Sequence, residues 1–152
     1  MQSAAWVAAL ATRGWAQEHE NKNVGDLILP FEFAAGRGSI LIHVRVDNRP
    51  AVLILDTGSS HTILKPSAIG LSRSDLASPR TGGGVIGDAV GREVTLEIGQ
   101  RRWHRRRIAV MDLSQALSAY KERIDGLLGI DLLLEFSQAV IDFKNRRVTL
   151  VA

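Results

Sequence analysis

Short segments in which apolar and polar side chains alternate recur along most of this 152-residue chain. Residues 27–33, 40–46 and 94–98 each show a two-residue period, which is typical of β-strands with one buried face. Turn-forming residues separate these segments, as in the run 47–50. Pro30 lacks a backbone N–H, so the first segment is predicted to be an edge strand. The pattern restricts the chain to a mostly-β fold built from many short strands.

Helical periodicity is confined to two late segments. One begins at Ser114, which can cap it, and ends before Gly126, with Leu117, Tyr120 and Ile124 on one face. The other covers residues 130–136. Aromatic residues make up only 5% of the chain and there are 14 glycines, a mixture that favours tight turns over long helices. The length is sufficient for one domain with its own hydrophobic core.

The first 26 residues differ from the rest of the chain. An apolar stretch over residues 4–11 is followed by Gly14-Trp15-Ala16, which is typical of a signal peptide, although no positive charge precedes it. Residues 1–16 are interpreted either as an export signal, for a periplasmic or secreted protein, or as a flexible tail of a cytoplasmic one. Residues 17–26 read as a linker. The apolar stretch is too short to cross a bilayer, so no transmembrane segment is predicted.

The charge and cysteine content exclude several classes of protein. A net charge of +3 is too small to indicate a nucleic-acid-binding protein, and nucleic acid is not an expected partner. The absence of cysteine excludes disulfides, thiolate metal sites and a cysteine nucleophile. The histidines lack metal-ligand spacing, so no metal is predicted. Five arginines between Arg101 and Arg107 fit either a solvated strand or a surface for acidic partners.

Asp56-Thr57-Gly58 is the segment with the most chemical content. It follows the continuous apolar run 51–55, which predicts a strand buried on both faces. A carboxylate at the end of such a strand needs compensating hydrogen bonds. Gly58 allows a backbone N–H to approach the carboxylate, and the hydroxyls of Thr57 and Ser59 can bond to nearby groups. These parts can hold a carboxyl group rigidly while its charge changes, although the tripeptide alone is also an ordinary turn.

The context of the tripeptide indicates a family. Residues 52–60 resemble the active-site strand and loop of aspartic peptidases, and residues 125–133 resemble the second signature of that family. Between them, the glycine-rich segment 82–91 lies where retropepsins carry their flap. The closing segment 140–150 is similar to bacterial retropepsin-like proteins. The resemblance covers roughly residues 38–151 and implies an all-β, closed-barrel-like retropepsin (acid protease) fold with one or two short helices across residues 27–152.

The resemblance also implies an activity and a stoichiometry. Peptidases of this kind use two carboxyl groups that share a proton, since like charges about 3 Å apart cannot both ionise. The chain has one Asp-Thr-Gly and no Asp-Ser-Gly, so the second Asp56 is expected from another copy across a two-fold axis. The expected protein is a homodimeric aspartic endopeptidase that cleaves peptide or protein substrates without a metal or an organic cofactor.

Residue roles follow from the resemblance wherever the motifs match. Asp56 would be catalytic, Thr57 would brace the loop against the partner copy, and Gly58 would help to bind substrate, with Ser59 as a further donor. The expected flap residues are Gly83, Gly84, Val85, Ile86 and Gly87, and the expected supports of the catalytic loop are Leu128 and Gly129. Asp131 and Asp142 are expected on solvated surfaces.

Other functions remain open at this point. The same fold could serve as a non-catalytic peptide-binding or dimerisation module, in which the carboxylates are unused. The arginine run could bind polyanions. A phosphate-binding loop at residues 82–87 is disfavoured, because neither Lys-Ser nor Lys-Thr follows the glycines.

Overall fold

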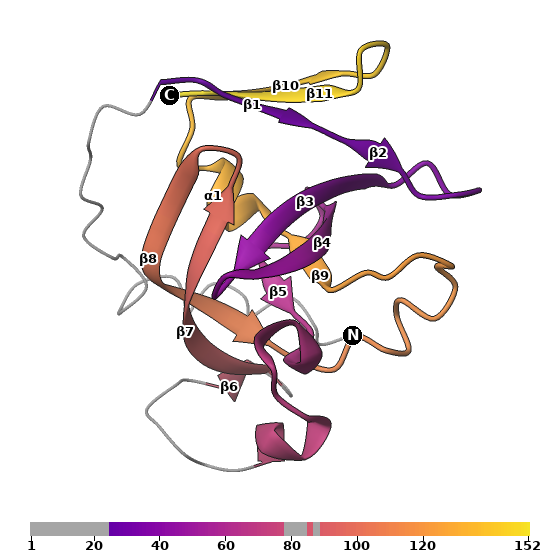
Figure 1. The fold of residues 1–152 in the computed structure, drawn as a ribbon, viewed down its shortest axis with the longest axis vertical. Helices are drawn as coiled ribbons and strands as arrows, with labels where there is room; N and C mark the ends of the chain where they lie inside the picture. The colour runs from indigo at the N-terminus through magenta and orange to yellow at the C-terminus, as the bar shows by residue number, and fades with distance from the viewer. Residues whose placement is uncertain (1–24, 78–84, 87–88) are drawn as a thin grey trace, which may run out of the picture.

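The computed structural model describes residues 25–77, 85–86 and 89–152. Strands make up most of the regular structure in these residues, which confirms the mostly-β prediction (Figure 1). In chain order the elements are β1 (Leu27–Pro30), β2 (Glu32–Phe33), β3 (Ile40–Val46), β4 (Arg49–Leu55), β5 (Ile63–Leu64), the 3-10 helices η1 (Pro66–Ile69) and η2 (Arg73–Ala77), β6 (Val85–Ile86), β7 (Ala89–Ile98), β8 (Arg101–Val110), β9 (Gly126–Leu128), α1 (Ile130–Leu133), β10 (Gln138–Asp142) and β11 (Arg147–Val151).

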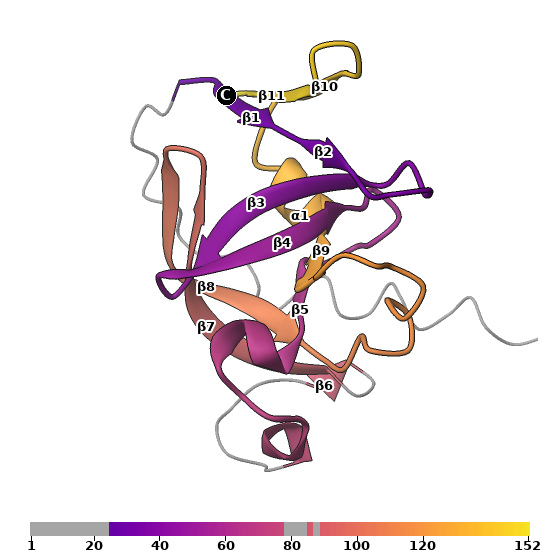
Figure 2. The ribbon, with the colours of Figure 1, turned by 45° about the vertical axis from the view of Figure 1, so that its right-hand side comes forward.

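Six strands close into a barrel. The larger sheet has the order β2-β3-β4-β9-β5-β8-β7-β6, and β3 also pairs with β7. That second pairing, Arg45↔Glu97 and Val46↔Leu96, joins the two sides of the sheet, so β3, β4, β9, β5, β8 and β7 form a ring. Figure 2 shows these strands curving around a common interior. The predicted closed-barrel architecture is confirmed.

The barrel interior holds the main hydrophobic core. Its most deeply buried side chains come from strands that alternate as the sequence predicted, and from β9 and α1; they include Ile42, Val46, Leu53, Leu64, Leu96, Ile98, Ile108, Val110, Leu128 and Leu132. In β4, Ala51, Leu53 and Ile54 are buried, and Val52 and Leu55 are half-buried. The strand that leads to Asp56 is therefore covered on both faces, as its unbroken apolar run predicted.

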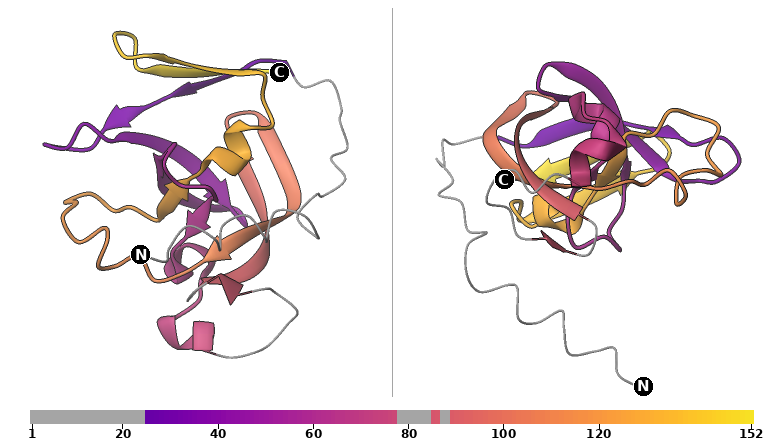
Figure 3. Two further views of the ribbon diagram at one scale, coloured as in Figure 1. Left: turned by 180° about the vertical axis from the view of Figure 1, so that it is seen from behind. Right: turned by 90° about the horizontal axis from the view of Figure 1, so that it is seen from below.

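A three-stranded sheet, β1-β11-β10, packs beside the barrel. Leu27, Leu29, Val148 and Leu150 on its inner face belong to the same core as the barrel. Pro30 lies in β1, an edge strand, as expected for a residue without an N–H. In Figures 1 and 3, α1 lies between this sheet and the barrel.

The predicted helix that begins at Ser114 is wrong. Residues 111–125 form turns and irregular chain. The three residues of the predicted apolar face, Leu117, Tyr120 and Ile124, do share one environment, a smaller cluster around Leu41 and Ile54 on the outside of the barrel. The spacing of these three residues therefore indicated that they are buried against one surface, and an irregular segment can bury residues in this way as well as a helix can.

The second predicted helix, over residues 130–136, is only the single turn α1. Residues 1–24, which include the predicted signal peptide or tail and most of the predicted linker, lie outside the described residues. Among the helices that the structure describes, none has the length and apolar character needed to cross a membrane.

Candidate active site

Asp56 stands at the point where β4 leaves the barrel wall. The parallel pairing of β4 with β9 extends to Leu55↔Leu128, the last position before Asp56. The Asp56 N–H then donates to the Leu128 carbonyl at 3.0 Å. The carboxylate is therefore carried by a backbone that is fixed up to its own residue, and its side chain is only partly exposed.

The loop after Asp56 folds back on the carboxylate. The Gly58 N–H donates to Asp56 Oδ1 at 2.9 Å, and the Ser59 N–H donates to the Asp56 carbonyl at 3.2 Å. A Cβ at Gly58 would lie 3.2 Å from the same carboxylate oxygen. Thr57 and Gly58 are exposed. Gly58 thus provides the close backbone donor that the sequence analysis expected, and the tip of the loop faces outwards.

β9 passes directly beside this loop, between β4 and β5. It runs parallel to β4 and antiparallel to β5, so its three residues join both strands that flank the Asp56 loop. A Cβ at Gly126 would lie 2.1 Å from the Ile63 carbonyl oxygen, and one at Gly129 would lie 2.4 Å from the His61 carbonyl oxygen. Only glycine permits these approaches. Leu128 is fully buried between the two strands.

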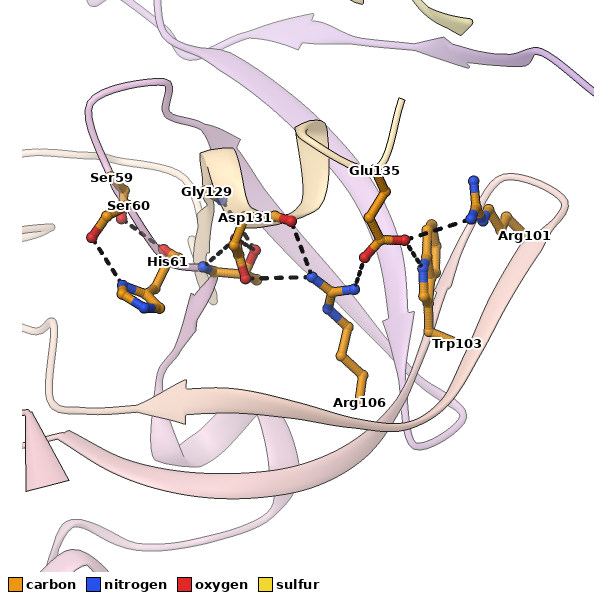
Figure 4. A network of polar contacts seen from close by, with 10 residues as sticks. Ser59, Ser60, His61, Arg101, Trp103, Arg106, Gly129, Asp131 and Glu135 are labelled. Atoms are coloured by element: carbon orange, nitrogen blue, oxygen red, sulfur yellow. Dashed lines mark hydrogen bonds and ion pairs between the residues drawn. The ribbon is translucent and has the colours of Figure 1, made fainter. Parts of the chain in front are cut away.

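Asp131 supports the far side of the loop (Figure 4). Its Oδ1 accepts hydrogen bonds from the Thr62 N–H at 2.7 Å and the Thr62 hydroxyl at 2.8 Å. The same hydroxyl accepts the Gly129 N–H at 3.1 Å, and the Ile130 N–H donates to the Ser59 carbonyl at 2.9 Å. The expectation that Asp131 lies on a solvated surface is therefore wrong. Sequence reasoning also missed Thr62, a buried polar residue directly before the short apolar strand β5.

The arginine run forms β8, and most of its side chains have acidic partners. Arg102 pairs with Glu97, which is mostly buried, and Arg105 pairs with Glu93 at an exposed position. Arg106 is buried and contacts both Asp131 and Glu135. These ion pairs offset much of the positive charge of the run. The structure therefore favours a strand whose arginines have acidic partners within the chain over a surface that binds polyanions.

The predicted flap lies mostly outside the described residues, which include neither Gly83, Gly84 nor Gly87. Val85 and Ile86 form β6, which pairs antiparallel with the start of β7 through Val85↔Val90 and Ile86↔Ala89. Within the described part of the chain, no group of three or more histidine, aspartate or glutamate side chains could hold a metal ion.

A family model and two solved structures are similar to this chain. Residues 42–132 match the family model described as aspartyl protease. The fold is similar to a retropepsin-like aspartic protease from Rickettsia conorii, with a TM-score of 0.54 and 22% identity over 83% of this chain and 90% of that one. A second solved structure, EIAV protease complexed with the inhibitor HBY-793, has a TM-score of 0.40 and 19% identity over 68% and 93% of the two chains.

No curated protein matches the chain. The family model nevertheless spans more than half of it and includes the Asp56 loop, β9 and Asp131. On this evidence the chain belongs to the aspartyl protease family and has the retropepsin-like fold.

Proposed function

We propose that the chain is an aspartic endopeptidase that hydrolyses peptide bonds with a water molecule activated between the Asp56 carboxyl groups of two identical copies. The observation that carries this proposal is the position of Asp56 on a backbone fixed by Leu128, with the Gly58 N–H at 2.9 Å from its Oδ1. Groups that stabilise a transition state act best when they are already in place before the reaction.

The requirement for a second copy follows from the chemistry of the carboxyl pair. At a separation of about 3 Å, like charges cannot both ionise, so one carboxyl stays protonated while the other acts as a base. The chain supplies one Asp-Thr-Gly. Thr57 and Gly58 are exposed at the tip of the loop, where a partner copy and a substrate can reach them. In the proposal, Thr57 braces the partner's loop and Gly58 contacts the substrate backbone.

The reaction needs no group beyond the carboxyl pair and water. The ionised carboxylate takes a proton from water as the water oxygen bonds to the scissile carbonyl carbon, and the protonated carboxyl gives its proton to the carbonyl oxygen. In the second step a hydroxyl of the intermediate returns a proton to the carboxylate, and the other carboxyl protonates the amide nitrogen as the C–N bond breaks. The products are a carboxylic acid and an amine.

The proposed substrate is an extended peptide segment. A strand-like chain can be held through its backbone, with apolar side chains in pockets on either side. The segment 82–91 would close over it as a flap, with Val85 and Ile86 as its apolar cover. Ser59 would keep the loop in shape, because its hydroxyl donates to the His61 carbonyl at 2.7 Å.

The test is cleavage of an unfolded protein such as casein, from acidic to neutral pH. The wild type is compared with Asp56→Asn and with Asp142→Asn, which changes an aspartate on the distant β10. The expected result is cleavage with an acidic optimum, lost in Asp56→Asn by a factor of at least about 1,000 and retained in Asp142→Asn. Specific activity should fall on dilution, because the site needs two copies.

Two outcomes would contradict the proposal. Cleavage that survives Asp56→Asn would place the chemistry elsewhere. A wild type that is dimeric by sedimentation, binds unfolded peptides and does not cleave them would support a peptide-binding module on the same fold.

A further inference from the structure

We infer that Arg106 is a positioning residue for the Asp56 loop, acting through Asp131 and Thr62. Its effect on catalysis rests on the proposed function, whereas its effect on the loop rests only on the contacts described below. These contacts form one continuous network in Figure 4, from β8 through α1 to the loop.

The first step is the orientation of Asp131. One carboxylate oxygen, Oδ1, accepts both donors of Thr62. The rotation of the carboxylate plane about that oxygen is therefore fixed by the contacts of the other oxygen, Oδ2. Arg106 Nη2 lies 3.4 Å from Oδ2 and 3.5 Å from the Asp131 carbonyl oxygen. A guanidinium presents its donors in a fixed planar arrangement, so contacts of one nitrogen with side chain and main chain restrict both.

The second step is the restraint of Arg106 itself. Its Nη1 contacts Glu135 Oε1, and the other oxygen of Glu135 accepts the Trp103 Nε1–H at 2.7 Å. Arg101 Nη2 also lies 3.5 Å from that oxygen. The side chains of Arg106 and Glu135 are only 9% and 11% exposed. The guanidinium is thus held on both sides in a nearly dry environment, where its contacts are stronger than at a surface.

The network compensates for the shortness of α1. A single helical turn of four residues, Ile130–Leu133, has no stability of its own in water. Asp131 at its start and Glu135 just after its end both contact Arg106. Arg106 of β8 therefore fixes α1 at two points. Asp131 and Ile130 of α1 then bond to Thr62 and Ser59, which connects α1 to the Asp56 loop.

The burial of Arg106 indicates that its role is to orient Asp131 and Glu135 rather than to fill space in the core. Its Nε is buried without a hydrogen-bond partner among the described groups, which is a cost that an apolar side chain would avoid. Apolar replacements of buried ion pairs are often neutral or stabilising, so packing alone does not require a guanidinium here. What an apolar side chain could not supply is the contact with both Asp131 and Glu135.

Two variants and one control test the inference. Arg106→Lys keeps the charge but cannot bridge two carboxylates with a planar fork. Glu135→Gln keeps the shape but weakens the hold on Arg106, and it covers the case in which Arg106→Lys fails to fold. Arg102→Lys is the control, because it lies on the same strand, pairs with Glu97 and is half-exposed.

The first measurement is native-state amide hydrogen exchange, which does not depend on catalysis. The amides of Thr62 and Gly129 bond directly to side chains of the network. In both test variants they should exchange at least about tenfold faster, while the amides of the central strand β11 keep their wild-type rates. Arg102→Lys should leave all of them unchanged.

The second measurement is the pair of kinetic constants for a peptide that the wild type cleaves. Misplacement of a reacting group lowers kcat more than KM, so kcat should fall by about 10- to 100-fold with KM changed by less than about threefold. Arg102→Lys should match the wild type.

Each other outcome has a definite meaning. Wild-type exchange and wild-type kcat in both variants would overturn the inference. Faster exchange everywhere, β11 included, would also overturn it, because Arg106 would then only stabilise the fold. If the wild type cleaves no peptide, the proposed function fails, and the exchange rates at Thr62 and Gly129 alone decide whether Arg106 positions the loop.

Discussion

Asp56 and Asp131 lie on segments that touch, yet their carboxylates have opposite surroundings. Asp131 accepts two hydrogen bonds from Thr62 and also contacts Arg106. For Asp56, the side-chain hydrogen bond that the described residues provide is the Gly58 N–H. Asp131 is thus held through both of its carboxylate oxygens and joins α1 to the residues that follow the Asp56 loop. The Asp56 carboxylate is partly exposed and, among the described residues, bonds to one backbone donor.

The largest predicted effect comes from adding a side chain at Gly129, where the end of β9 packs tightly against the backbone of His61 and Thr62. Gly129→Ala would place a methyl group 2.3 Å from the His61 carbonyl carbon and 2.7 Å from the Thr62 nitrogen, and these backbone atoms cannot rotate away. Unfolding in urea should show a loss of about 3 kcal/mol or more, at the upper end for overpacking. Gly25→Ala is the control, because nothing lies within 4 Å of the corresponding Cβ. Equal stability of the two variants would show that the loop and β9 are not tightly joined.

Two threonines five positions apart, Thr57 and Thr62, sharpen the same contrast. Thr62→Val leaves the partly buried Asp131 Oδ1 and the buried Gly129 N–H each short of one partner, which should cost about 1–3 kcal/mol of unfolding free energy. Thr57→Val changes an exposed side chain and should alter the stability of the single chain by less than about 0.5 kcal/mol. Under the proposed function, Thr57→Val should instead weaken dimerisation and cleavage. Similar losses of stability in both variants would remove the distinction between the two sides of the loop.

The smallest predicted effect concerns a third carboxylate, on the irregular segment outside the barrel. The Ala35 N–H donates to Glu122 Oε1 and holds the pKa of that carboxyl below its ordinary value of 4.5. Because the folded-state pKa is lowered, the stabilisation is complete above pH 4.5 and is lost as the pH falls through the lower folded-state value. Glu122→Gln should therefore be slightly less stable than the wild type at neutral pH and equally stable in strong acid.

The measurement is a series of urea unfolding curves across this pH range. A difference between Glu122→Gln and the wild type that stays constant down to strong acid would mean that the Ala35 contact depends on shape and not on charge. The result bears on the comparison of the carboxylates, because the proposed activity has an acidic optimum. At acidic pH, contacts that depend on an ionised carboxylate begin to weaken.

Local patterns predicted the strands well because strand alternation and burial both follow from the two-residue period. The segments 40–46, 94–98 and 51–55 lie in strands, and the segment 140–150 lies in the closing hairpin of β10 and β11. The Asp56 loop was also identifiable, because its residues follow one another in sequence. What the sequence did not reveal were contacts between segments far apart in the chain, such as Thr62 with Asp131.

Arg106 shows why such contacts escape a period-based prediction. In a regular strand Trp103 and Arg106, three positions apart, would face opposite sides of the sheet. Arg105 has a positive φ of 50°, and the register between β7 and β8 shifts between Val94 and Leu96. This irregularity turns both Trp103 and Arg106 inward. A β-bulge of this kind leaves no clear signal in a run of arginines.

The position of β9 between β4 and β5 has a consequence for the order in which the molecule assembles. Leu53 pairs with Gly126, and Leu27 pairs with Leu150. Each of these strands therefore pairs with a strand that is synthesised much later. Pairings of such large sequence separation form slowly, since a long loop must close first. During synthesis, the Asp56 loop lacks its supporting strand until residues beyond 131 have left the ribosome. The Asp56 loop is therefore among the last parts of the molecule to become organised, and under the proposed function no peptidase activity arises on the nascent chain.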